Sequence, residues 1–245
     1  MDLPLYKHNF DQLKIEADAY RAFFVDTLNS FEVYYRHEKL EDRDEKLFDE
    51  ASCIIRRRTP LIKYYGAELA VTISQKSIQA LGGQGFMDEH SVEQWHRDSF
   101  GPLLYEGTSQ IQALMAMKDL VKGIAKNPYC YFKSLLSSKI GLSKEEKEVK
   151  EWQFQLKKKF GSLIFKSLKP KNISGYAIKA NWFSEEKNEK LMIHAETICQ
   201  GLAYLETMEV LALHTRIDIE RKTLFWNYQK LVTPRFLQIF ETWKV

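Results

Sequence analysis

The sequence predicts an all-α protein. Apolar residues recur at spacings of three and four, glycine or proline marks the ends of these stretches, and the first 128 residues show no period-two alternation bounded by hairpin turns. The clearest stripe lies near the N-terminus and consists of Phe10, Leu13, Ala17, Tyr20, Phe24, Leu28, Phe31 and Tyr35. We therefore expect a bundle of long helices over residues 1–128.

The second part of this bundle is expected to follow a charged turn. Acidic and basic residues from Glu38 to Lys46 lead into a helix that begins near Leu47. Thr59-Pro60 fits either a cap with a first-turn proline or a kink in one longer helix. The apolar face that follows stops at Gly82-Gly83, a helix-ending signal.

Two further helices complete the expected bundle. A short one is expected around Val92 and Trp95. The next begins at Ser109, carries its own apolar stripe, and ends at Asn127-Pro128.

Residues 143–245 differ in composition, being rich in lysine and tryptophan. Ser143 and Glu146 have the spacing of a capping box, and the helix that follows is expected to close at Pro170. Another helix is expected over residues 191–205, and a last one runs from about Ile217 with an interruption at Pro234. We interpret residues 143–245 as a separate helical appendage without a recognisable motif.

Bulk properties exclude several classes of protein. The formal net charge is +3, and acidic residues flank both basic runs, 56–58 and 157–159, which argues against a nucleic-acid partner. The 3 cysteines form no CxxC pair, which suits a reducing cytoplasm and predicts no structural metal site. No N-terminal signal pattern and no apolar run of bilayer length is present. A cytoplasmic location is therefore expected.

Residues 79–86, QALGGQGF, are rich in glycine. Their spacing does not match GxGxxG, and the element before them is a helix, so a dinucleotide-binding loop is excluded. A helix end followed by a tight turn explains part of the pattern. The segment has more glycines than a helix cap requires, namely Gly82, Gly83 and Gly85. Residues without side chains would let another molecule approach the backbone closely.

Residues 93–98, EQWHRD, place an arginine beside an aspartate. Ion pairs commonly fix the ends of helices, so Arg97 and Asp98 are expected to form a buried structural pair. His96 has no visible acid or nucleophile partner, and we assign it a structural role.

Residues 104–112, LYEGTSQIQ, combine an acid, a glycine and a hydroxyl where a helix begins. Thr108 suits a helix cap, and Glu106 suits the positive end of the helix dipole. The alternative is that Glu106 is a general base beside a cofactor, with Leu104 and Tyr105 as the apolar neighbours that favour proton uptake by a carboxylate.

Taken in order, these three motifs resemble the C-terminal helical domain of the acyl-CoA dehydrogenases. The resemblance covers residues 1–128 and is specific over 79–112. Thr59, Pro60 and Lys63, together with the helical tail, look most like the larger bacterial members, which carry an extra C-terminal helical domain.

The resemblance implies α,β-dehydrogenation of an acyl-CoA thioester, as in fatty acid β-oxidation. Glu106 would remove the α-proton, its backbone N–H would polarise the thioester carbonyl, and Tyr105 and Gly107 would border the substrate. The implied cofactor is FAD. Its implied contacts are Gln79, Ala80, Leu81, Gly82 and Gly83 from a neighbouring subunit, and Thr108, Ser109 and Gln110. The implied partners are a second copy in a homo-oligomer and electron-transferring flavoprotein as the electron acceptor.

The chain departs from the family pattern upstream of the bundle. The family's N-terminal helical domain, its middle β-domain and an Arg-x-x-Phe-Gly signature do not occur in this sequence. The hypotheses are a fragment, one subunit of a split enzyme whose other chain supplies these domains, or a truncated, non-catalytic scaffold for oligomerisation. Retention of Glu106 with the glycine turn and Thr108 favours an enzyme component. A DNA-binding role is a distant third because of the balanced charge.

Overall fold

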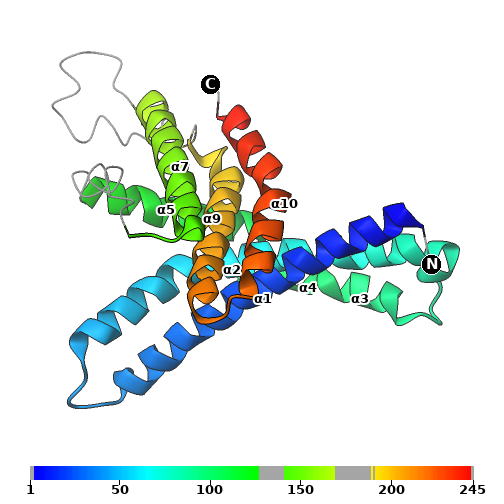
Figure 1. Cartoon of the computed structure of the whole chain (residues 1–245), viewed down its shortest axis with the longest axis horizontal. Coiled ribbons are helices and arrows are strands. Elements are labelled where there is room, and N and C mark those ends of the chain that lie inside the picture. Colours follow the sequence, from blue (N-terminus) through cyan, green and yellow to red (C-terminus); the bar gives the residue numbers. More distant parts are fainter. Residues whose placement is uncertain (1–2, 127–140, 169–188, 190, 244–245) are drawn as a thin grey trace.

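The computed structural model describes residues 3–126, 141–168, 189 and 191–243 (Figure 1). The secondary structure of these residues is helical, which confirms the all-α class. The long helices are α1 (Pro4–Glu38), α2 (Glu45–Leu81), α5 (Ser109–Lys126), α7 (Lys144–Leu168), α9 (Ala195–Ile217) and α10 (Arg221–Thr242). Three short helices connect α2 to α5, namely η1 (Gly82–Phe86), α3 (Ser91–Ser99) and α4 (Gly101–Leu104). None of the described helices is long and apolar enough to cross a membrane.

Helix α2 is continuous through Pro60, so the expected second and third helices are one. Asp44 caps it by accepting the backbone N–H groups of Lys46 and Leu47 at 3.0 and 3.1 Å. The Thr59 hydroxyl donates to the Ile55 carbonyl at 2.7 Å, so Thr59 lies inside the helix and caps nothing. The prediction of a cap at Thr59 is therefore wrong, and the alternative of one longer helix is correct.

The predicted interruption at Pro234 is also wrong, because α10 runs through it. The helix begins at Arg221, and Ile217 is the last residue of α9. An internal proline costs about 3 kcal/mol, and the complete burial of neighbouring Val232 and Phe236 offsets that cost.

The predicted capping box is confirmed. The Ser143 N–H donates to the Glu146 carboxylate at 2.9 Å, and the Glu146 N–H donates to the Ser143 hydroxyl at 3.1 Å. Gly82, with φ 62°, ends α2 as expected. The predicted helix ends at Asn127-Pro128 and Pro170 lie outside the described residues.

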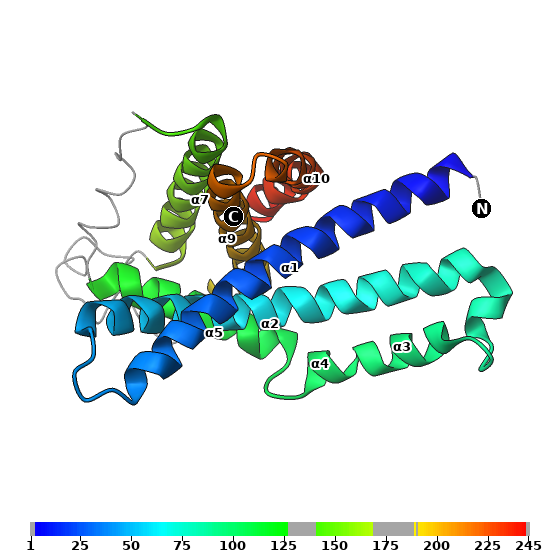
Figure 2. The same ribbon diagram turned by 60° about the horizontal axis from the view of Figure 1, so that its bottom comes forward.

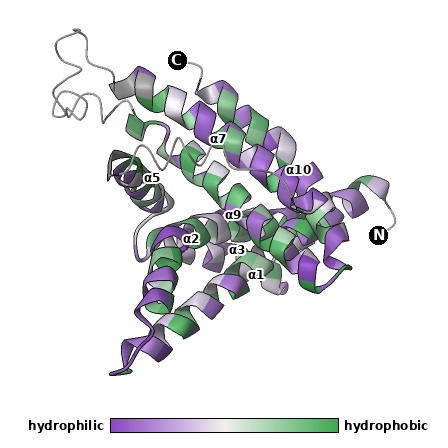
Figure 3. Cartoon of the chain, turned by 60° about the vertical axis from the view of Figure 1, so that its left-hand side comes forward, coloured by the Kyte–Doolittle hydropathy of each residue, from purple (hydrophilic) through white to green (hydrophobic). Residues whose placement is uncertain are grey.

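Helices α1 and α2 form an antiparallel pair, and α9 packs across both of them (Figures 1 and 2). Helices α7 and α10 flank α9, so that the three lie side by side. The α1–α2 turn projects from this assembly and is largely hydrophilic (Figure 3). One hydrophobic core includes Phe23 and Leu61 from the first half, and Ile198, Met208 and Phe236 from the second. The boundaries 1–128 and 143–245 remain predictions, and the described parts of both ranges share this core.

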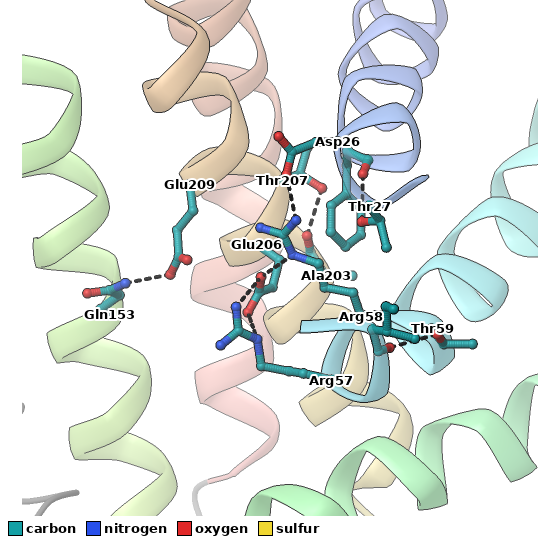
Figure 4. Close-up of polar contacts among 12 residues, drawn as sticks. Asp26, Thr27, Arg57, Arg58, Thr59, Gln153, Ala203, Glu206, Thr207 and Glu209 are labelled. Carbon is teal, nitrogen blue, oxygen red and sulfur yellow. Dashed lines mark hydrogen bonds and ion pairs between the residues drawn. The ribbon is translucent and has the colours of Figure 1, made fainter. Parts of the chain in front are cut away.

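A buried ionic network joins α1, α2 and α9 (Figure 4). Arg58, only 5% exposed, donates through Nη1 to Asp26 at 2.6 Å and through Nε to Glu206 at 2.9 Å. Arg57 binds the second oxygen of Glu206 at 2.7 Å. These bonds neutralise the buried charges, which would otherwise carry a large desolvation penalty.

A second polar cluster joins α1, α2 and α10. Glu16, 4% exposed, accepts two bonds from Arg235 Nη1 at 2.8 and 2.9 Å. It also accepts the Tyr65 hydroxyl at 2.9 Å, and the hydroxyls of Tyr65 and Tyr228 lie 3.1 Å apart. The two clusters fix how α9 and α10 sit on the α1–α2 pair, because buried polar groups need specific partners.

Glu209, which accepts a hydrogen bond from Gln153 (Figure 4), provides a test of this polar layer. Burial raises the pKa of Glu209, and the nearby Glu206 carboxylate raises it further. The folded chain therefore binds this proton more tightly than the unfolded chain, whose glutamate has a pKa of about 4.3. The stability contributed by the protonated group is present below that pH and is lost as the pH rises through the folded pKa.

We therefore expect Glu209→Gln to raise the free energy of unfolding at pH 7, because the amide avoids the buried charge. The gain should shrink as the pH falls and vanish near pH 4. Urea denaturation at several pH values measures it, with exposed Glu41→Gln as the control. A gain that does not change with pH would contradict the charge argument.

Candidate active-site loop

The loop between α4 and α5 carries Glu106. Its φ is 54°, and Glu106 is the one non-glycine residue with positive φ among the described residues. The left-handed conformation costs a residue with a side chain about 1–2 kcal/mol. Gly107 follows with φ 93°, which glycine adopts without that cost. A strained residue of this kind persists only where its surroundings hold it.

Two helices hold this loop. The buried Gln112 side chain of α5 donates through Nε2 to the Glu106 carbonyl at 2.8 Å. A Cβ atom at Gly107 would lie 3.1 Å from that Nε2, so the amide packs directly against the loop. From α2, Lys63 donates to the Pro102 carbonyl, and its Nζ lies 4.2 Å from the centre of the Tyr105 ring.

A cavity of about 440 Å³ lies between α1, α2 and this loop. Glu106 and Lys63 bring charged groups to its wall. Most of the other lining residues are apolar or aromatic, namely Tyr20, Phe24, Leu28, Phe31, Ile62, Ala67, Pro102 and Tyr105. A carboxylate at the edge of an apolar cavity is an arrangement suited to general-base chemistry on an apolar ligand.

The sequence predicts that Leu104 and Tyr105 surround the Glu106 carboxylate with apolar groups, and the structure does not bear this out. Leu104 is 68% exposed and Tyr105 is 57% exposed, so they do not enclose the carboxylate within this chain. Most of the apolar surface beside Glu106 comes from α1 and α2, and Pro102 and Tyr105 add to the same cavity wall. The sequence does not predict this apolar surface, because the α1 residues that contribute to it lie about 80 positions before Glu106.

The start of α5 has the features of an anion site. The Thr108 carbonyl accepts the Gln112 N–H at 3.0 Å, so the helix begins at Ser109 and its first N–H groups have no partner within the helix. Ser109 Oγ is buried and has no hydrogen-bond partner among the described residues. Gln110 is exposed. These residues fit a phosphate-bearing cofactor such as FAD, which would supply the partner that Ser109 lacks.

The second predicted cofactor segment, Gln79–Gly83, lies at the far end of α2 (Figure 2). The 16 residues from Lys63, which contacts the Glu106 loop, to Gln79 span about 24 Å of helix. One chain therefore does not bring its two predicted flavin segments together. Gly85 is required within the chain, because a Cβ there would lie 2.6 Å from the Ile78 carbonyl oxygen, whereas Gly83 faces open space.

The expected buried pair of Arg97 and Asp98 is wrong. Both residues are exposed, and Arg97 pairs with Glu93 at 3.5 Å. Residues four apart share one face of a helix, whereas adjacent residues point in different directions. His96 bonds the Ser74 hydroxyl at 2.9 Å and packs edge-on against Phe100, in agreement with a structural role.

The helical bundle therefore holds a candidate general-base site, in which a strained glutamate lies beside an apolar cavity. The model of the family described as "Acyl-CoA dehydrogenase, C-terminal domain" matches residues 1–121. This part of the chain therefore belongs to the acyl-CoA dehydrogenase C-terminal domain family.

Similar proteins agree with this assignment. The chain is 34% identical over 100 residues to the broad-specificity linear acyl-CoA dehydrogenase of Mycobacterium tuberculosis, covering 41% of this chain and 16% of that protein. It is 33% identical over 88 residues to the caffeyl-CoA reductase–Etf complex subunit CarC of Acetobacterium woodii, covering 36% of this chain and 21% of that protein.

The fold resembles a solved acyl-CoA dehydrogenase from Bacillus anthracis complexed with FAD. The TM-score is 0.69 at 18% identity, over 99% of this chain and 43% of that one. Both halves of the chain therefore fit one known arrangement of helices. The matches span about a fifth or less of the two curated relatives named above.

Proposed function

We propose that the chain is the C-terminal part of a flavin-dependent acyl-CoA dehydrogenase in which Glu106 removes the α-proton of the thioester. The observation that carries the proposal is the left-handed Glu106 at the edge of the apolar cavity. A helix-start carboxylate needs neither backbone strain nor a cavity. Membership of residues 1–121 in the dehydrogenase family supports the same assignment.

The residues of this chain would divide the chemistry between them. The apolar cavity wall would receive the acyl chain, and Tyr105 and Gly107 would border the thioester. The Glu106 carboxylate would take the α-proton, and its backbone N–H would donate to the thioester carbonyl, which acidifies the α-carbon. FAD, when bound near Thr108, Ser109 and Gln110, supplies the acceptor for the hydrogen that leaves the β-carbon.

The proposed assembly includes more than one chain. Gln79–Gly83 is too far along α2 to serve the same flavin as Thr108–Gln110, so this turn would contact the flavin of a second copy. Electron-transferring flavoprotein is the proposed acceptor, in keeping with the Etf complex that names one relative. A separate chain with the N-terminal and β domains of the family is a further proposed partner.

The test of the proposed function is acyl-CoA-dependent reduction of a dye. The chain would be tagged and purified with its native assembly from its own source, then supplied with saturated acyl-CoA thioesters of several lengths. The expected result is dye reduction that requires both the acyl group and flavin. An assembly that holds flavin and reduces no dye with any thioester would contradict the proposal.

Flavin binding by the chain alone is expected to be weak. Its two predicted flavin segments lie apart, and Gln79, Gly82, Gly83 and Gln110 are exposed. A titration of flavin fluorescence with the purified chain measures the affinity, and the native assembly is the positive control. Stoichiometric FAD in the chain purified alone would contradict this prediction and would indicate a complete site within one copy.

A further inference from the structure

We infer that Lys63 and Gln112 are positioning residues that hold Glu106 in its left-handed conformation from two sides. The inference rests on the proposed function, because Glu106 matters only if it is the base. The known motifs around Glu106 assign no role to either side chain.

Lys63 holds the approach to Glu106. Its side chain is partly buried in the cavity wall, and its ammonium group donates to the Pro102 carbonyl while lying 4.2 Å from the centre of the Tyr105 ring. A cation over an aromatic face is attracted to the ring, and the attraction strengthens as water is excluded. Lys63 forms no ion pair with a carboxylate among the described residues. Its ammonium group therefore contacts the segment just before Glu106, at Pro102 and Tyr105.

Gln112 holds Glu106 itself. It is 8% exposed, and its bond to the Glu106 carbonyl at 2.8 Å fixes the peptide plane between Glu106 and Gly107. A Cβ atom on Gly107 would crowd both this amide and Ile111, at 3.1 and 3.2 Å. The glycine therefore allows the loop to approach Gln112 closely enough for this bond to form.

The two contacts act at either end of the strained residue. One fixes Tyr105 from α2, and the other fixes the Glu106 carbonyl from α5. The strain of a single left-handed residue is small enough for these contacts to outweigh. When either contact is lost, the loop should relax to another φ and carry the carboxylate away from the cavity.

The first experiment measures the loop without reference to activity. NMR chemical shifts and the amide–Hα coupling of Glu106 report its φ in the purified chain. In Lys63→Met and Gln112→Leu we expect the Glu106 signals to shift or broaden, while Lys63→Arg keeps them. Exposed Lys46→Met is the control. Unchanged Glu106 signals in both folded variants would overturn the inference.

Lys63→Gln, a milder change, replaces Lys63→Met if circular dichroism shows that the methionine variant does not fold.

The second measurement uses the native assembly. Misplacement of a catalytic group by about 1 Å can cost 10²-fold in rate, so we expect kcat to fall about 10- to 100-fold with little change in KM, and Lys63→Arg to recover most of it. A loop that moves without any loss of kcat would overturn the catalytic importance of the positioning. Loss of the proposed function itself would appear separately, as an active Glu106→Gln enzyme whose loop still depends on Lys63 and Gln112.

Discussion

Glu106→Gln is expected to lower turnover of the native assembly by about 10²–10⁴-fold, because the amide has the shape of the carboxylate but cannot accept the α-proton. Its backbone carbonyl still accepts from Gln112, so the left-handed loop and the cavity should be preserved. Binding of flavin and acyl-CoA should therefore survive. Steady-state kinetics with one saturated acyl-CoA, together with the visible spectrum of the bound flavin, measure both outcomes.

The competing interpretation of Glu106 predicts a different result. If Glu106 only complements the dipole of α5, its replacement should cost about 0.3–1 kcal/mol of stability and leave activity unchanged. Glu89→Gln, in the exposed turn before α3, is the matched control for loss of a carboxylate. Equal turnover in Glu106→Gln and Glu89→Gln would remove Glu106 from the mechanism and favour a non-catalytic scaffold.

The features that the sequence predicts well are local. The stripe from Phe10 to Tyr35 needs only the period of a helix, and α1 spans it. The capping box at Ser143 depends on two residues three apart. The family resemblance at residues 104–112 likewise depends on neighbouring letters, which is why it directs attention to Glu106 before any contact is known.

The features that the sequence does not predict depend on packing between distant segments. Pro60 and Pro234 are helix breakers by local rules, but both stay inside helices whose neighbouring residues are buried. The cavity beside Glu106 needs α1, and the restraint on its loop needs Lys63 of α2. Lys63 is part of the motif formed by Thr59, Pro60 and Lys63, but nothing in the spacing of that motif predicts its contact with Tyr105.

The run Arg56-Arg57-Arg58 shows the same limit most clearly. By composition it is a short basic patch flanked by acids. In the structure Arg56 is on the surface, whereas Arg58 is buried against Asp26 and against Glu206, which lies 148 positions away. Three consecutive helical residues point in three directions, and only the packing of α9 decides which one is buried.

Arg58→Met is therefore expected to lower the free energy of unfolding by about 3 kcal/mol, the lower end of the range for a broken buried pair. The change removes the arginine partner of the partly exposed Asp26 and one of the two arginine partners of the buried Glu206. Arg56→Met is the matched control. It deletes an ion pair with Asp119 in which the arginine is 71% exposed, and solvent screening leaves such exposed pairs with little effect on stability. Urea denaturation followed by tryptophan fluorescence measures both variants.

A second substitution separates lost charge pairing from lost packing. If the cost of Arg58→Met arises from the unpaired carboxylate, adding Asp26→Asn should recover part of the stability, because the neutral amide needs no cation beside it. Asp26→Asn alone should destabilise the chain, since Arg58 then keeps only Glu206. An Arg58→Met variant as stable as Arg56→Met, or a double variant no more stable than Arg58→Met, would show that the network contributes little as an ion pair. The expected recovery would instead show that the ion pairs of Arg58 fix α9 on α1 and α2, the two helices that line the Glu106 cavity.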